Sequence, residues 1–142
     1  TLLFAYVPML MDTGGNAGNQ TSTLIIRGLA LGEIQIKDYF AVLFKEVRVA
    51  LICGVALAAV NFGRMILLNG AASQNFKMYL VVCAAMLCSV VAAKCIGCSL
   101  PMLAKMVHLD PALMAGPMIT TIVDALTLII YFSLATTFLH IA

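Results

Sequence analysis

One carboxylate stands out because it lies inside an otherwise uncharged stretch of the chain. Asp124 belongs to the run of residues 111–142, which is long enough to cross a bilayer. A helix rises about 1.5 Å per residue, which puts Asp124 about 20 Å beyond Pro111, near the middle of a membrane. A carboxylate at that depth costs several kcal/mol unless it faces a cavity, a partner or an ion. Asp124 is therefore the first candidate for a functional group.

Hydroxyl groups surround Asp124 at helical spacing. Thr120, Thr121 and Thr127 are three or four residues from Asp124, and Tyr131 is four residues beyond Thr127, so these groups predict one polar stripe on a helix. Mg²⁺ is usually held by one or two carboxylates through a retained water shell. The stripe suits such a partly hydrated Mg²⁺, and it suits Zn²⁺ or Cu⁺ badly because it carries no His or thiolate. Mn²⁺ and Co²⁺ stay open as alternatives, since both accept oxygen ligands.

A second polar cluster lies within an apolar stretch near the start of the chain. Residues 12–20 contain three glycines and four acid or amide side chains, namely Asp12, Asn16, Asn19 and Gln20. We predict that this cluster interrupts the helix and lines a pore or site, because intramembrane polar clusters mark ion paths. The alternative is a close helix contact through small residues, with the amides hydrogen-bonded between helices.

The triplet at residues 12–14, Asp-Thr-Gly, resembles that of aspartic proteases. Such an enzyme needs a second carboxylate that shares a proton, and Asp124 is the only candidate. The triplet lacks its usual structural context, so we do not expect an enzyme.

The partner of Asp124 has two candidates. A single carboxylate leaves a divalent ion half neutralised, and a twofold homodimer would bring two copies of Asp124 together. Alternatively, Asp124 pairs with Lys94, the cation within the third apolar segment, since buried charges usually find partners. We expect Glu46 to lie at the membrane interface.

The composition requires a membrane environment for these groups. The 142 residues are 63% hydrophobic and 10% charged, against about 25% charged in soluble domains. The net charge of +2 is too small to indicate nucleic acid as a partner. The predicted fold is an all-α membrane protein: one helical bundle with four transmembrane helices and a short amphipathic helix at the membrane surface. The predicted transmembrane segments are residues 2–31, 47–68, 78–103 and 111–141, and the amphipathic helix lies within residues 32–47.

Basic residues predict the orientation in a cell membrane. The first and third loops with their helix ends hold Arg27, Lys37, Lys45, Arg48 and Lys105. The second loop holds two basic residues. Cytoplasmic loops carry the excess of Lys and Arg, so we expect the first and third loops inside and both termini outside. An external start without a basic leader region leads us to expect a longer protein with a fifth helix upstream.

Two motifs resemble one known family. Residues 8–20 (PMLMDTGGNAGNQ), followed by IRGLA at residues 26–30, resemble the second transmembrane helix of MgtE magnesium channels. DPA at residues 110–112, GPMITTIVD at 116–124 and IYF at 130–132 resemble the last helix of that family. The resemblance covers essentially the whole chain, with matching helix order and loop lengths.

The resemblance implies a homodimer with five helices per subunit and a central pore. Asp124 matches the pore aspartate that holds a hydrated Mg²⁺ with its symmetry mate. Gly15, Asn16, Asn19 and the backbone near Thr120 match other pore-lining positions. Asp12 stands where some relatives have Gly, which adds an acidic group beside the pore. The family also carries cytoplasmic N and CBS regulatory domains, and none of these residues belongs to them.

We therefore predict a Mg²⁺-selective channel, formed by residues 1–142 as a single transmembrane pore domain. An ion-coupled divalent cation carrier is one alternative, although carriers often show paired broken helices. A structural membrane subunit with no transport of its own is the other alternative.

Overall fold

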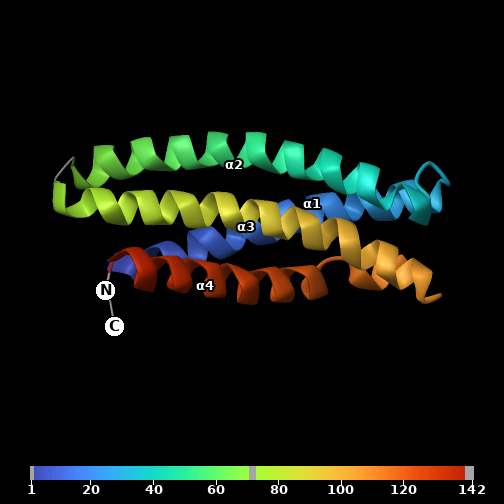
Figure 1. The fold of residues 1–142 in the computed structure, drawn as a ribbon. Helices are drawn as coiled ribbons and strands as arrows, with labels where there is room; N and C mark the ends of the chain where they lie inside the picture. Colours follow the sequence, from blue (N-terminus) through green and yellow to red (C-terminus); the bar gives the residue numbers. More distant parts are fainter. Residues whose placement is uncertain (1, 71–72, 140–142) are drawn as a thin grey trace.

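The computed structural model describes residues 2–70 and 73–139, and four long helices account for most of them (Figure 1). No strand occurs within these residues, so the all-α prediction is confirmed. The centre of the second loop, residues 71–72, lies outside the described part, as does His140. The elements are α1 (Leu2–Ala30), η1 (Ile36–Asp38), α2 (Tyr39–Asn69), α3 (Ser73–Met106), η2 (Pro111–Met114) and α4 (Pro117–Leu139).

Three stretches of the described chain are long and apolar enough to cross a membrane: Ile36–Asn69, Phe76–Met106 and Pro111–Leu139. The 29 residues of α1 match the thickness of a bilayer, but their polar centre keeps α1 out of this set. Large apolar side chains of α2 face outward, with Ile52 72% and Val60 73% exposed. A continuous apolar surface of this kind needs lipid or protein to cover it. A membrane crossing by α1 itself stays a prediction.

Helix α3 is the centre of the bundle. It packs against α1, α2 and α4, whereas α2 has its main contacts with α3 alone. Half of the most apolar stretch of α3 is buried, compared with 17% of that of α2 and 22% of that of α4. Because α1 contacts both α3 and α4, different sides of α1 face these two helices.

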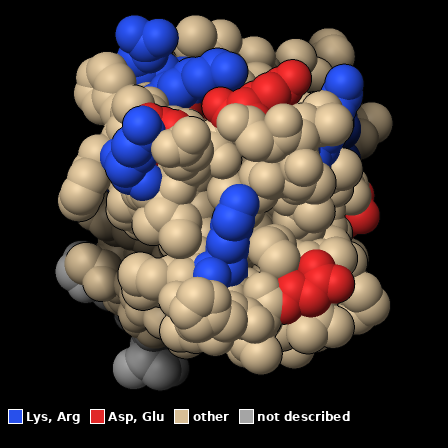
Figure 2. Space-filling model, turned by 90° about the vertical axis from the view of Figure 1, so that its right-hand side faces the viewer, with Lys and Arg blue, Asp and Glu red and all other residues tan. Residues whose placement is uncertain are grey.

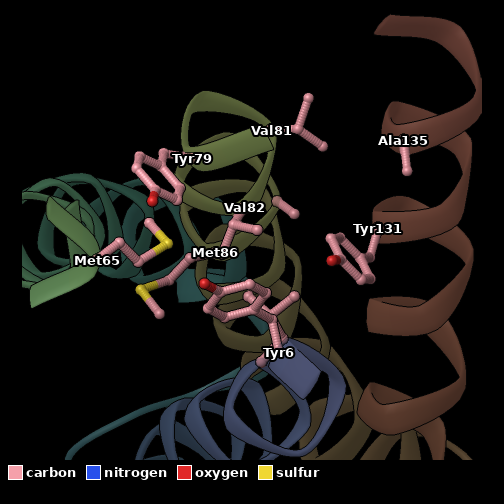
Figure 3. Packing of buried hydrophobic residues seen from close by; sticks show 10 residues of the cluster. Tyr6, Met65, Tyr79, Val81, Val82, Met86, Tyr131 and Ala135 are labelled. Atoms are coloured by element: carbon pink, nitrogen blue, oxygen red, sulfur yellow. The ribbon is translucent and has the colours of Figure 1, made fainter. Parts of the chain in front are cut away.

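An apolar cluster closes the end of the bundle at which the chain starts. Figure 3 shows side chains from all four helices that meet there, among them Tyr6 of α1, Met65 of α2, Tyr79 and Met86 of α3, and Tyr131 of α4. The buried hydroxyl of Tyr131 donates to the carbonyl oxygen of Leu3 (2.9 Å). This cluster joins α1 and α4 at one end and leaves their polar residues in the middle of the bundle.

The predicted break in the first helix is wrong. Helix α1 is continuous through residues 12–20. A continuous helix satisfies every backbone N–H and C=O within itself, which a membrane interior demands. The glycines serve close packing instead, because a Cβ on Gly97 of α3 would overlap the carbonyl oxygen of Gly18.

The separate amphipathic helix is also absent from the described residues. After the turn η1, α2 begins at Tyr39 and runs without interruption to Asn69. Phe40 and Phe44 are 79% and 65% exposed, so they lie on one outward face as their spacing indicates. No Gly or Pro lies between Tyr39 and Gly54 to end the helix, and the predicted surface helix is therefore the first turns of α2.

The break in the backbone lies in the last segment. Asp110 caps η2 and accepts a hydrogen bond from the backbone N–H of Ala112 (2.9 Å). The turn ends at Gly116, whose φ of 63° suits glycine, and α4 starts at Pro117. The segment from Pro111 is long and apolar enough to span a membrane, as predicted, but it is not one continuous helix. Asp124 lies about 10 Å along α4.

Charged groups gather at the end of the bundle formed by the first and third loops. Arg27 lies in the last turn of α1, Lys105 in the last turn of α3 and Lys37 in η1. Figure 2 views this end and shows basic and acidic side chains spread over it. The Lys105 ammonium donates to the carbonyl oxygen of Leu29 (3.4 Å), where a cation also suits the helix dipole.

The contact between Gly18 and Gly97 makes a test of the packing. We expect Gly97→Ala to destabilise the protein by about 1–3 kcal/mol, because the added methyl group must push α1 away from α3. The measurement is the free energy of unfolding in detergent, with the loss of helical signal as the readout. Gly63→Ala is the matched control, since nothing lies within 4 Å of a Cβ there. Equal stability of the two variants would show that the approach of α1 to α3 is not tight.

Candidate functional site

Helices α1 and α4 meet along a line of glycines. A Cβ on Gly18 would lie 3.0 Å from Cγ2 of Ile119 and 3.2 Å from Cγ2 of Val123. A Cβ on Gly15 would lie 3.4 Å from Cγ2 of Thr120 and 3.8 Å from Oδ1 of Asp124. The missing side chains therefore let the backbone of α1 approach the polar residues of α4.

A hydrogen bond joins the two helices beside this contact. Nδ2 of Asn19 donates to Oγ1 of Thr120 (2.9 Å), and Oγ1 of Thr120 donates to the carbonyl oxygen of Gly116 (3.2 Å). The amide oxygen of Asn19 is buried and accepts no hydrogen bond from the described residues. The Asn19 oxygen is one of two hydrogen-bond acceptors beside Gly15 and Thr120 that have no donor among the described residues.

The other free acceptor belongs to Asp124. This side chain is half-buried, and its Oδ1 atom is buried without a hydrogen-bond donor in the described part of the chain. No salt bridge to Asp124 occurs among these residues either. An unpartnered carboxylate oxygen is costly in a membrane protein unless a ligand or water satisfies it.

The first acidic residue of the polar cluster lies on the outer side of α1. Asp12 is exposed, and its Oδ2 accepts a hydrogen bond from Nδ2 of Asn16 one turn later (3.2 Å). Gly15, Asn19, Thr120 and Asp124 meet where α1 contacts α4, whereas Asp12 and Asn16 lie on the exposed side of α1 next to them. These six predicted metal-site residues are here called the α1–α4 polar face.

The predicted hydroxyl stripe is only partly on this face. Thr120 and Asp124 are half-buried at its edge. Thr127 and Tyr131 are instead buried inside the bundle. Thr121 points outward and donates to the carbonyl oxygen of Pro117 in its own helix (2.8 Å). A helix of 3.6 residues per turn carries successive members of a long stripe around its axis, which explains the difference.

The donor set of the face suits a hydrated cation. The described residues contain no group of three or more His, Cys, Asp or Glu side chains that could enclose a bare ion. The face offers carboxylate, amide and hydroxyl oxygens. Such groups bind the water shell of Mg²⁺, which that ion gives up reluctantly.

Lys94 is not the partner of Asp124, and this alternative is wrong. Its ammonium forms a salt bridge with Glu46 (Nζ to Oε2, 3.4 Å), and both side chains are buried. The expectation that Glu46 lies at the membrane interface is therefore also wrong. Because α2 starts earlier than predicted, Glu46 is within the helix and reaches the interior of the bundle.

The sequence reasoning missed the hydroxyl group of Thr21, which donates to Glu46 (2.8 Å) and accepts from Lys94 (3.0 Å). It also missed Ser22, whose Oγ donates to the carbonyl oxygen of Met114 in η2 (3.3 Å). The sequence did contain a signal for the pair, because Glu46 and Lys94 each lie in a largely apolar run. Burial in a membrane favours pairing of opposite charges.

The fold and this face define a class of protein, a multi-helix membrane protein with polar groups on the contact of two helices. Comparison with known sequences identifies it further. The sequence model of the MgtE family, described as divalent cation transporter, matches residues 7–134. The chain belongs to the MgtE family, and the resemblance seen in the sequence is confirmed.

Three curated relatives are named magnesium transporter MgtE. The protein of Thermus thermophilus is 37% identical, that of Bacillus subtilis 32% and that of Enterococcus faecalis 30%. These matches cover 95%, 95% and 99% of this chain. The chain spans 29–30% of the length of these relatives.

The bond between Asn19 and Thr120 can be tested by a double-mutant cycle. We expect Asn19→Ala and Thr120→Val to be coupled by about 0.5–1.5 kcal/mol, because either change removes the same interhelical hydrogen bond. The measurement is the free energy of unfolding in detergent for the two single variants and the double variant. Thr121→Val is the control, since its hydroxyl bonds only within α4. Additive effects at Asn19 and Thr120 would contradict the contact.

Proposed function

We propose that this chain forms the pore of a Mg²⁺ channel in the cell membrane, with Asp124 as its principal ion-binding group. The observation that carries the proposal is the buried Oδ1 of Asp124, which has no donor among the described residues. Family membership supports Mg²⁺ as the transported ion. Mn²⁺ and Co²⁺ fit the same oxygen donors.

The ion is bound with most of its water. Asp124 accepts hydrogen bonds from the water shell, together with the free amide oxygen of Asn19 and the hydroxyl of Thr120. Asp12 and Asn16 extend the polar surface along α1. Gly15 has no side chain to obstruct the space in front of Asp124.

A second copy of the chain completes the pore. Exposed polar groups in the membrane require a partner or a water-filled path. A twofold axis beside the α1–α4 polar face would set two copies of Asp124 opposite one another, and their two charges match one divalent ion. The homodimer therefore supplies both the cover for this face and the second carboxylate.

The two loops at the charged end of the bundle are cytoplasmic in this proposal, and the helix ends near Leu2 and Leu139 are external. The basic residues of the first and third loops support this orientation. A negative interior then draws Mg²⁺ inward with about 2.3 kcal/mol per charge for each 100 mV. Ion-coupled carriers often show paired broken helices, and the continuous α1 is not broken in this way.

Asp124 provides the direct test. We expect Asp124→Asn and Asp124→Ala to lower Mg²⁺ flux by about tenfold or more, because the charge that replaces bulk water around the ion is lost. The measurement is Mg²⁺ uptake into proteoliposomes at equal protein content. Glu33→Gln, a change in an exposed loop carboxylate, is the control and should keep normal flux. Near-normal flux in both Asp124 variants would exclude the pore role, and single-channel currents would exclude a carrier.

The homodimer makes a separate prediction. We expect Thr121→Cys to form a disulfide-linked dimer under mild oxidation, because Thr121 is exposed on α4 beside the proposed twofold axis. The measurement is the dimer fraction on non-reducing gels of native membranes. Ile129→Cys, which is exposed elsewhere on α4, is the control. A dimer fraction no higher for Thr121→Cys than for the control would contradict this interface.

A further inference from the structure

Four successive residues of α1 are hydrogen-bonded to all of its neighbouring elements. Asn19 donates to Thr120 of α4 (2.9 Å). Gln20 accepts from Lys94 of α3 (3.5 Å), and Thr21 bonds to both Lys94 and Glu46. Ser22 donates to Met114 in η2 (3.3 Å). Successive residues of a helix point about 100° apart, so this single turn is held from every side.

Lys94 and Glu46 form the hydrogen bonds to two of these four residues, Gln20 and Thr21. The ammonium of Lys94 has three donors, and they reach Gln20 (3.5 Å), Thr21 (3.0 Å) and Glu46 (3.4 Å). Oε2 of Glu46 accepts from both Lys94 and Thr21. Because Gln20 and Thr21 are adjacent, binding both at once allows α1 only one rotation about its own axis.

Packing alone does not fix α1 on this side. Helices α1 and α2 have few direct contacts, and a cleft of about 570 Å³ lies between them. Asp12, Asn16 and Gln20 line the cleft from α1, and Lys94 lines it from α3. A rotation of α1 toward this space would break the hydrogen bond between Asn19 and Thr120.

We propose that Lys94 and Glu46 are positioning residues, which fix the rotation of α1 and thereby hold Asn19 against Thr120, one turn before Asp124 on α4. The proposal rests on the proposed function, since it assigns these residues to the same ion site. Neither Lys94 nor Glu46 touches the ion. Their effect passes through Thr21 and Gln20.

A purely structural role explains less of this arrangement. A buried salt bridge is often no more stabilising than an apolar pair of similar volume, so stability alone gives little reason for it. Charged groups do fix one geometry among several that apolar packing tolerates. The pair is also the main polar link between α2 and α1 near the ion site.

The experiment measures rotation and transport separately. Rotation is followed by the disulfide yield between Asn19→Cys and Thr120→Cys in membranes of the full chain, quantified by peptide mass spectrometry. Phe4→Cys with Phe132→Cys is the control pair, because it joins the same helices near the start of the chain (ring centroids 5.7 Å apart). Transport is followed as the Mg²⁺ concentration that gives half-maximal flux, in chains without added cysteines.

Two changes test the pair without leaving a lone buried charge. Thr21→Val removes the hydroxyl that joins α1 to the pair, and Thr21→Ser keeps it. Lys94→Met combined with Glu46→Leu replaces both charges by apolar groups. We expect Thr21→Val and the double variant to lower the 19–120 disulfide yield and to raise the half-maximal Mg²⁺ concentration, each by about threefold to tenfold. Thr21→Ser should remain near wild type, and the 4–132 yield should not change.

The other outcomes overturn the inference. Wild-type 19–120 yields in both test variants would show that the pair does not set the rotation of α1. A parallel loss of the 4–132 yield, or failure of both variants to reach the membrane, would show a general structural role. Normal transport by Asp124→Asn would refute the proposed function alone, because the disulfide yields report the rotation of α1 independently of transport.

Discussion

The close approach of α1 to α3 and α4 is the constraint on which the other features of the bundle depend. It occurs at Gly14, Gly15 and Gly18 on α1 and at Gly97 on α3. Within a membrane, burial of apolar groups against lipid-like neighbours gives little driving force, so helices associate through tight packing and hydrogen bonds. Short side chains form these bonds only when the backbones are near each other. The glycines of α1 therefore determine whether Asn19 can reach Thr120 at all.

The close approach also decides which charges remain unpaired. Lys94 is a buried basic residue of the bundle, and Asp124 and Glu46 are acids of the apolar helices α4 and α2. On one side of α1, Lys94 donates a hydrogen bond to Thr21 and forms a salt bridge with Glu46. Asp124 lies on another side of α1, where no described residue donates to its Oδ1. Because Glu46 pairs with Lys94, the carboxylate of Asp124 remains without a cation, and an ion site requires such a carboxylate.

The sequence predicted the helices better than their geometry. Apolar runs identified all four long helices, and Gly15, Asn19, Thr120 and Asp124 meet because α1 packs against α4. That these residues bind a metal ion stays a prediction. The break was placed in α1 because glycines and amides are common in irregular backbone. In α1 those glycines face neighbouring helices, and a sequence does not show which neighbour a glycine faces. The Lys94–Glu46 pair was missed for the same reason, since the choice between two acids depends on the rotation of three helices.

The two acids of the polar face have different places in the proposed mechanism. Asp124 is half-buried beside Gly15, whereas Asp12 is exposed and already accepts a hydrogen bond from Asn16. A buried charge interacts with an ion more strongly than an exposed one, because less water screens it. We therefore propose that Asp124 and its symmetry mate neutralise the ion, whereas Asp12 and its mate raise the cation concentration nearby.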